Sequence, residues 1–164
     1  MYFILKVVCF DKVDLANINT DYFSFDVSSL NASGNSIACL ALNTFESYFN
    51  IFEINLSVNL LTQIPVDSLN NINSANSANS LNTLVLLDFS YNLISWLNMT
   101  LITNNLKYLN LSHNLLTSIN DNTFVSVSSL LDLDLSYNQI GMIRKNSFFG
   151  LNNLKTLNLD KNFL

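Results

Sequence analysis

The chain has 164 residues, which is enough for one ordinary domain. Hydrophobic residues make up 49% of it, charged residues only 12%, and the formal net charge is −5. This composition excludes wholesale disorder, because the chain has ample apolar surface to bury. It also disfavours binding to nucleic acid or to anionic lipid, since both need a basic surface. The sequence therefore predicts a folded acidic domain with no nucleic-acid partner.

The chain begins with an apolar stretch at 1–10 that contains Lys6. A secretory signal would carry its charge ahead of the apolar run and small residues at a cleavage site, and neither is clear here. We therefore interpret residues 1–10 as a first strand or a capping segment, with a signal segment as the alternative. No run of about 18 apolar residues occurs in the chain, so we expect no membrane span.

Cysteine and histidine are scarce. Cys9 and Cys39 are the only cysteines, and His113 is the only histidine. The two cysteines could form one disulfide, but two buried free thiols are the favoured interpretation, because no other disulfide signal accompanies them. One histidine and two cysteines are too few for a Cys/His zinc site. We expect no metal ion and no cofactor.

A repeated pattern starts at residue 27 and continues to residue 164. Its form is LxxLxLxxNxΦ, where Φ is apolar, as in LVLLDFSYNLI at 84–94, LKYLNLSHNLL at 106–116, LLDLDLSYNQI at 130–140 and LKTLNLDKNFL at 154–164. Looser copies are VSSLNASGNSI at 27–37 and IFEINLSVNLL at 51–61. The repeated asparagines are Asn35, Asn59, Asn92, Asn114, Asn138 and Asn162, with spacings of 24, 33, 22, 24 and 24 residues. Apolar residues also recur five and ten positions after each of the first five, so the register extends beyond the motif.

The motif has a physical cause in the way its side chains alternate. The leucines of LxL point to one face of a strand, and about seven apolar side chains per repeat face a common interior. Burying them contributes about 10–20 kcal/mol, less than the cost of ordering a repeat at about 1.5 kcal/mol per residue. Repeats must therefore stack, with their strands in one parallel sheet. We expect each repeated asparagine to satisfy backbone groups of its own repeat and of the neighbouring one, because its side chain is both donor and acceptor.

The repeats resemble the leucine-rich repeat family, in its typical 24-residue subclass, over residues 27–164. This resemblance implies an α/β fold: a right-handed solenoid with a single parallel sheet on its concave face and short helical or irregular convex segments. Residues 1–26 would form an irregular N-terminal capping segment, and residues 27–164 six repeats, the last incomplete. The segments LDLSYNQI and NSFFGLNNLKTL are similar to animal extracellular leucine-rich proteins, including Toll-type receptor ectodomains.

Two places depart from the regular pattern. The longest spacing contains a low-complexity insertion at 70–82, with NSANSANS at its centre, which we interpret as a flexible loop because small polar residues cannot bury surface. The sequence also stops inside the motif, at Leu164. An open repeat end exposes leucines and an unpaired strand edge, so we expect either a piece of a longer protein or end-to-end self-association through this C-terminal end.

Partners of this family usually bind on the concave face, which the residues between the leucines would line. Aromatic and acidic residues gather in these columns, and Tyr91, Tyr108, His113 and Tyr137 should cluster there. The candidate site is completed by Asp88, Asn110, Asp132 and Asp134. Aromatic side chains beside acids suit a protein partner carrying Lys or Arg. The alternative is that such residues are simply good strand surface.

Catalysis is not expected. Ser112, His113 and Asp134 could suggest a hydrolase, but they would lie on one flat strand face with no oxyanion pocket. We therefore predict a protein-interaction module in an extracellular or cell-surface receptor or adhesion protein. An intracellular adaptor or scaffold is the alternative, and an enzyme a distant third.

Four glycosylation sequons occur, at Asn31, Asn55, Asn98 and Asn110. With 28 asparagines in the chain, chance alone predicts about five sequons, so their number is no evidence of secretion. A disulfide between Cys9 and Cys39 and occupied sequons would favour an extracellular protein.

Overall fold

The computed structural model describes residues 28–41, 44–45, 51–70, 72, 83–101 and 103–164. The expected capping segment at 1–26 lies outside these residues. So does the expected insertion at 70–82, apart from Asn70 and Ile72.

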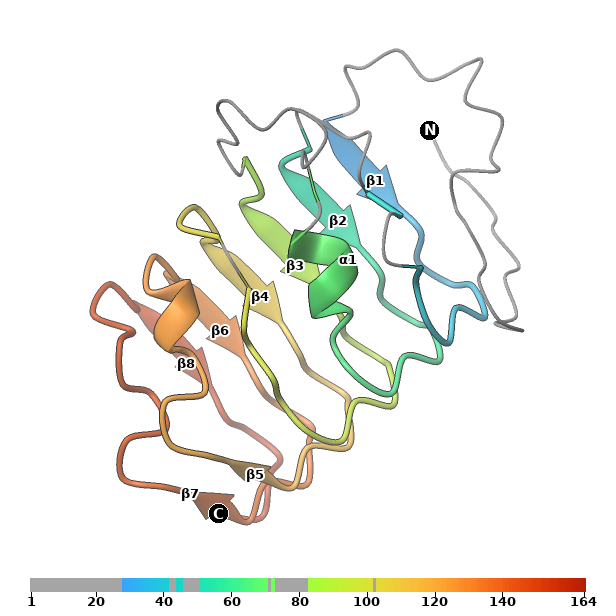
Figure 1. Ribbon diagram of the computed structural model, residues 1–164. Coiled ribbons are helices and arrows are strands. Elements are labelled where there is room, and N and C mark those ends of the chain that lie inside the picture. Colours follow the sequence, from blue (N-terminus) through green and yellow to red (C-terminus); the bar gives the residue numbers. More distant parts are fainter. Residues whose placement is uncertain (1–27, 42–43, 46–50, 71, 73–82, 102) are drawn as a thin grey trace, which may run out of the picture.

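Six short strands form one parallel sheet, and their order in space is their order in the chain. They are β1 (Ser29–Asn31), β2 (Glu53–Asn55), β3 (Leu86–Asp88), β4 (Tyr108–Asn110), β6 (Asp132–Asp134) and β8 (Thr156–Asn158). Figure 1 shows them side by side, with the segments that connect them on the other side of the coil. This arrangement is the solenoid with a parallel sheet that the repeat pattern predicts.

The strands pair in a constant register. The central leucines of β4, β6 and β8 are direct partners, so Leu109, Leu133 and Leu157 lie in a row. Ile54 of β2 pairs with Leu87 of β3 in the same register, although the insertion separates them. The longer spacing between these two repeats therefore leaves the register of the sheet unchanged.

The core consists of apolar tiers, one from each repeat. Ile54, Leu87, Leu109 and Leu133 are at most 2% exposed. Leu157 is 38% exposed, because β8 is the edge strand and no further tier covers its outer side. The burial of each leucine therefore depends on having a repeat stacked on both sides of it.

The described parts of the return segments contain only short regular elements. They contain the helix α1 (Val66–Asn70), the 3₁₀ turn η3 (Val125–Val127) and two strands, β5 (Ser118–Ile119) and β7 (Met142–Ile143). β5 and β7 form a second, two-stranded parallel ladder in addition to the expected sheet. Phenylalanines fill the core beneath these segments, and the rings of Phe124 and Phe148 are stacked with centroids 5.9 Å apart. None of the helices in the described part of the chain has the length and apolar character needed to cross a bilayer.

Cys39 corrects one expectation from the sequence. It is disulfide-bonded and its side chain is exposed, so the prediction of two buried free thiols is wrong. The only other cysteine of the chain, Cys9, lies outside the described residues. A single pair of cysteines has no diagnostic spacing, and the repeat pattern does not assign position 39 to the core. The sequence alone therefore could not distinguish a free thiol from a disulfide at Cys39.

Candidate interaction surface

Every strand of the six-stranded sheet ends on an asparagine or an aspartate. In all six, the side-chain Oδ1 accepts a hydrogen bond from the backbone N–H two residues later. The distances are 2.8 Å for Asp88 with Ser90 and 2.8 Å for Asp134 with Ser136. This is an Asx turn, and it bends the chain out of the strand. Asp88, Asn110 and Asp134, candidates for binding from the sequence, therefore also terminate their strands.

In four of the six repeats, a buried serine lies two positions after the last residue of the strand. Ser57, Ser90, Ser112 and Ser136 are all between 4% and 8% exposed. The column of serines therefore belongs to the interior of the turn and not to the binding surface.

The next residue in each repeat has a left-handed backbone. These residues form what we call the strand-end row: Gly34, Val58, Tyr91, His113, Tyr137 and Lys161, with φ between 52° and 68°. A non-glycine residue in this conformation costs about 1–2 kcal/mol. Glycine occupies the position only in the first described repeat, so five repeats carry a strained side chain.

The repeated asparagines follow the strand-end row and point inward. Asn114 Nδ2 donates to the carbonyls of Leu111 and, one repeat back, Phe89, at 3.1 and 3.0 Å. Its Oδ1 accepts from the backbone N–H of Ile94 at 2.9 Å. The same set of bonds to the preceding repeat recurs at Asn59, Asn92, Asn138 and Asn162. Each asparagine thus joins its own repeat to the preceding one.

Asn35, the first of these asparagines, differs from the rest. Its Nδ2 donates to the carbonyls of Ala32 and Ser33 in its own repeat. Its Oδ1 is buried without a hydrogen-bond partner, since no earlier repeat is present among the described residues.

Three aromatic side chains of the strand-end row are stacked. The ring centroids of Tyr91 and His113 are 4.0 Å apart and those of His113 and Tyr137 are 4.2 Å apart, with both pairs 10° from parallel. The close spacing of parallel strands brings these rings together, one from each of three consecutive repeats. Tyr91 and Tyr137 remain 54% and 49% exposed. The outer part of each tyrosine is therefore accessible to a partner.

Tyr108 does not join this stack. It is the first residue of β4, whereas the stacked rings follow the last residues of their strands. Its neighbours in register are Leu86 and Asp132, and it makes no ring contact within the described residues. The structure therefore divides the four expected aromatic residues into a stack of three at the strand ends and one residue at the strand starts.

The three aspartates lie on β3 and β6 beside these aromatic residues. Asp88 and Asp134 end their strands, Asp132 begins β6, and all three are half-buried. Asp134 Oδ2 accepts a hydrogen bond of 3.3 Å from Asn158 Nδ2. Within the described residues none of the three carboxylates has a cationic partner. The surface thus combines exposed aromatic edges with unneutralised negative charge.

The arrangement does not support nucleophilic catalysis. Ser112 is buried, and its Oγ donates to Asn110 Oδ1 at 2.8 Å. The His113 ring lies between two tyrosine rings, and in the described part of the chain it has no hydrogen bond to a serine hydroxyl. A nucleophile needs a base within hydrogen-bond reach, and this pair does not provide one. No group of three or more His, Cys, Asp or Glu side chains among the described residues could hold a metal ion.

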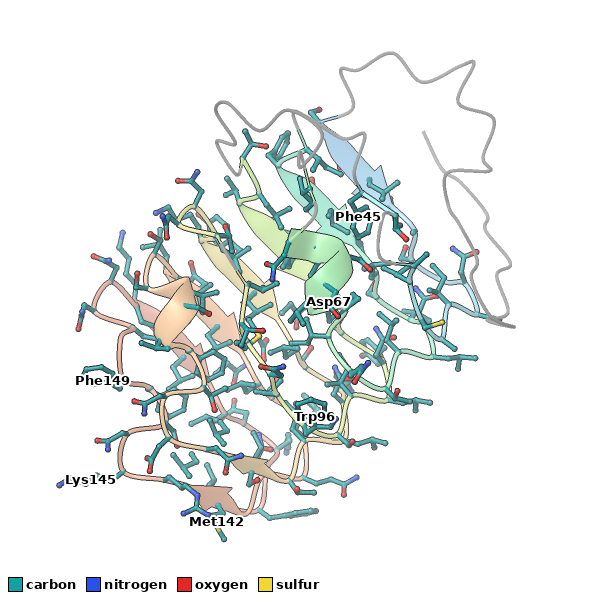
Figure 2. All side chains as sticks on the ribbon, in the orientation of Figure 1. Phe45, Asp67, Trp96, Met142, Lys145 and Phe149 are labelled. Carbon is teal, nitrogen blue, oxygen red and sulfur yellow. The ribbon has the colours of Figure 1, made fainter. Side chains whose placement is uncertain are left out.

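A second feature was missed by reasoning from the repeats. A hollow of about 370 Å³ opens between α1 and the return segments, lined in part by Gln63, Asp67, Trp96, Asn98 and Thr100. Figure 2 shows Trp96 on this side of the coil, near Asp67 of α1. The available signal was that the chain's single tryptophan lies outside the repeated motif, two residues before a sequon.

Comparisons with known proteins agree with this geometry. Residues 104–164 match the family model described as leucine rich repeat. No curated relative matches the sequence. The fold is similar to a chain of the TLR13–ssRNA13 complex, with 26% identity and a TM-score of 0.74 over 84% of this chain and 18% of that one.

Two further solved structures are similar. A chain of the Toll–Spatzle complex of Drosophila has 32% identity and a TM-score of 0.67, over 81% of this chain and 16% of that one. The leucine-rich repeat domain of APL1B has 25% identity and a TM-score of 0.56, over 83% and 43% of the two chains. This chain therefore spans less than half the length of each of the three. Six strands in one constant register show the leucine-rich repeat solenoid fold, and the family model matched over residues 104–164 together with these neighbours supports membership of the leucine-rich repeat family.

Proposed function

We propose that the strand ends of this solenoid bind a protein partner that exposes Lys or Arg. The stack of Tyr91, His113 and Tyr137 carries the proposal, because it aligns three rings on strained, left-handed backbone where glycine would fit without strain. Rigid aromatic side chains are enriched at the centres of protein interfaces. Leucine-rich repeat domains generally act as protein-interaction modules, and the Toll-like neighbours fit such a role.

The charge of the surface supports a basic partner. Asp88, Asp132 and Asp134 have no cationic partner within the described residues, and the whole chain carries a net charge of −5. Lys and Arg side chains bind both carboxylates and aromatic rings. Phosphate groups would be repelled, which disfavours RNA. The solved neighbours include one complex with single-stranded RNA and one with Spatzle, so the fold itself does not choose between the two classes.

An extracellular or cell-surface location fits this function. Cys39 is disulfide-bonded, and disulfides persist mainly in oxidising compartments. The likeness to the Toll–Spatzle structure supports a receptor or adhesion protein. An intracellular adaptor would be expected to keep Cys39 reduced.

The test is a binding screen with two matched sets of variants. The purified chain is screened against a displayed library of secreted protein domains, and each binder is measured again by surface plasmon resonance. The stack variant removes all three rings at once and combines Tyr91→Ala, His113→Ala and Tyr137→Ala. Asp88→Asn with Asp134→Asn removes charge but keeps the Asx turn, because asparagine ends the other four strands.

We expect the stack variant to weaken binding by at least about tenfold, as removal of central aromatic residues commonly does. The Asn variant should weaken binding and reduce its dependence on salt. Phe149→Ala, an exposed residue after β7 (Figure 2), is the control and should bind like the unmodified chain. Binders that tolerate both sets of changes, or a single-stranded RNA that competes for the strand ends, would contradict the proposal.

A further inference from the structure

Three of the four sequons are explained by the repeat itself. Asn31, Asn55 and Asn110 are the last residues of β1, β2 and β4, and each uses Oδ1 to accept the N–H of the serine two residues later. That serine is the hydroxyl residue of the sequon. Aspartate fills the same position in β3 and β6, so the position requires the acceptor oxygen and not the amide nitrogen. These three sequons are by-products of the Asx turn.

The fourth sequon, Asn98 to Thr100, lies in the return segment after β3 and outside the repeated motif. Its middle residue, Met99, is 3% exposed and anchors the segment in the core. The carbonyl of Thr100 accepts a hydrogen bond of 3.0 Å from Asn70 Nδ2. Asn98 itself is exposed, and its side chain makes no hydrogen bond within the described residues. The backbone is therefore held directly after an accessible asparagine side chain.

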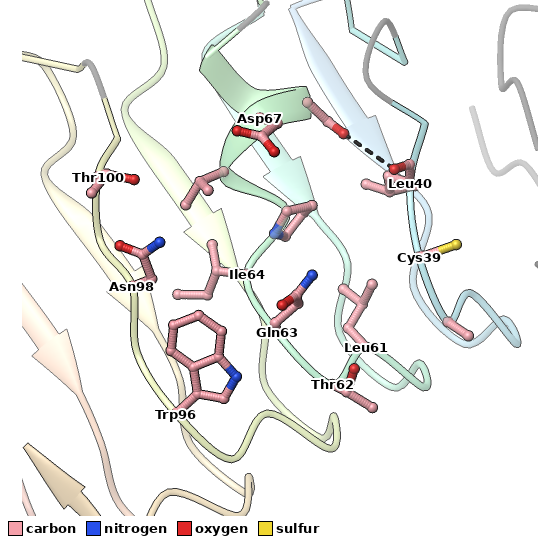
Figure 3. Close-up of a pocket in the computed structure, with 14 residues that line it drawn as sticks. Cys39, Leu40, Leu61, Thr62, Gln63, Ile64, Asp67, Trp96, Asn98 and Thr100 are labelled. Atoms are coloured by element: carbon pink, nitrogen blue, oxygen red, sulfur yellow. Dashed lines mark hydrogen bonds between the residues drawn. The ribbon is translucent and has the colours of Figure 1, made fainter. Parts of the chain in front are cut away.

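Asn98 faces a surface suited to a sugar. Asn98 and Trp96 come from the same segment and line the same hollow of about 370 Å³, as Figure 3 shows. The Trp96 side chain is 51% exposed, although a large apolar ring is normally covered. A pyranose ring has an apolar face that packs on an aromatic ring, and its hydroxyls need polar partners. Gln63, Asp67 and Thr100 supply donors and acceptors around the same hollow.

We propose that Asn98 is an N-glycosylation site and that the first sugar of its glycan packs on Trp96. In the transfer, Asn98 Nδ2 forms a bond to the anomeric carbon of an oligosaccharide carried on a lipid pyrophosphate. The bond from that carbon to the pyrophosphate oxygen breaks, and the lipid pyrophosphate leaves with the electron pair. The amide proton passes to a base of the transferase, and nothing is oxidised or reduced.

The position of this site is compatible with partner binding. Asn98 lies in a return segment, whereas the stack of Tyr91, His113 and Tyr137 follows the strand ends. A glycan at Asn110 would instead stand beside the stack and obstruct it. The proposal rests on the extracellular location proposed above, but not on the identity of the partner.

Mass spectrometry of the secreted full chain tests occupancy. The chain is produced in glycosylating eukaryotic cells and treated with the amidase PNGase F in water enriched in oxygen-18, which marks every occupied asparagine. We expect the mark at Asn98 alone. Asn98→Gln and Thr100→Ala should abolish the glycan, and the matched control Asn110→Asp, which keeps its Asx turn, should leave it unchanged.

Each outcome of this experiment is decisive for the site. A secreted chain with Asn98 bare overturns the proposal, and a glycan at Asn31, Asn55 or Asn110 overturns the interpretation of those sequons as by-products of the turn. If Asn98 is bare and the strand ends still bind a basic protein, the proposed function stands and only the glycan site fails. If Asn98 carries a glycan but the stack variants do not weaken binding, the glycan site stands and the proposed function fails.

Fluorescence tests the contact with Trp96, because it is the chain's only tryptophan. Trimming a high-mannose glycan with endoglycosidase H leaves one sugar on Asn98, whereas PNGase F leaves none and converts the residue to aspartate. We expect acrylamide to quench Trp96 at least about twofold less in the trimmed protein, since the sugar covers the ring. The Asn98→Asp variant should match the fully deglycosylated protein. Equal quenching in all three forms would overturn the contact.

Discussion

At the residue scale, one asparagine side chain per repeat binds backbone groups of two repeats at once. Asn114 is 4% exposed and bonds to the carbonyl of Phe89 and the N–H of Ile94 in the preceding repeat. These backbone groups are shielded from solvent. Leaving one of them without a hydrogen-bond partner costs about 1–3 kcal/mol. The high asparagine content of the chain is thus partly a structural requirement of stacking.

Asn114→Ala or Asn138→Ala should therefore lower the free energy of unfolding by about 2–4 kcal/mol, because each change leaves two or more buried backbone groups unpaired. Asn152→Ala is the control: Asn152 is exposed, and its replacement should stay within about 0.5 kcal/mol. Urea denaturation followed by circular dichroism measures all three. Equal losses for Asn152 and Asn114 would show that the inward amide does not join the repeats.

The sequence was sufficient to place these asparagines, because the motif fixes one amide in the turn after each strand. It was not sufficient for the strand-end row, since nothing in Tyr91, His113 or Tyr137 signals a positive φ. Sequence columns also suggested that Tyr108 belongs to the same cluster, but Tyr108 begins β4 whereas His113 lies beyond the end of that strand. The state of Cys39 depends on a partner that no local pattern identifies.

At the scale of elements, the return segments pack closely around glycine. Gly150 has a φ of 94°, and a Cβ added there would lie 3.1 Å from Val125 Cα at the start of η3. Gly141, which precedes β7, has no atom within 4 Å of such a Cβ. The close approach of Val125 thus requires a glycine at position 150, whereas position 141 has room for a side chain.

Gly150→Ala should cost about 1–3 kcal/mol of stability, because it combines a left-handed backbone with an overpacked contact. Gly141→Ala is the matched change earlier in the same return segment and should be close to neutral or slightly stabilising. Differential scanning calorimetry on the two variants compares them directly. A melting temperature that falls equally in both, or only in Gly141→Ala, would be inconsistent with the described packing of η3.

Strand positions could be predicted from the sequence, because LxL alternation sets both the strand and its buried face. The pairing of Ile54 with Leu87 also follows from the motif once the insertion is set aside. The short ladder of β5 with β7 and the hollow beside Trp96 could not be predicted in this way. Both depend on how non-repeated return segments approach each other in space.

At the scale of the whole molecule, stability passes from one repeat to the next. Each leucine tier is covered by its neighbours, and the tier at the β8 edge, which lacks one, leaves Leu157 partly exposed. The same stacking aligns equivalent side chains into rows, and this is how Tyr91, His113 and Tyr137 from three repeats become one surface. The proposed binding site therefore exists only if the repeats stack in register.

Cysteine cross-linking measures that register directly. Tyr108 and Asp132 are Cα partners on adjacent strands. The double variant Tyr108→Cys with Asp132→Cys therefore places two cysteines whose Cα atoms are about 5 Å apart, a distance that a disulfide can span. Tyr108→Cys with Thr156→Cys spans two strand spacings, about 10 Å, and is out of reach. Under mild oxidation, peptide mapping should find the first cross-link and not the second. A first pair that stays reduced, or a second pair that links as readily, would contradict the stacked solenoid.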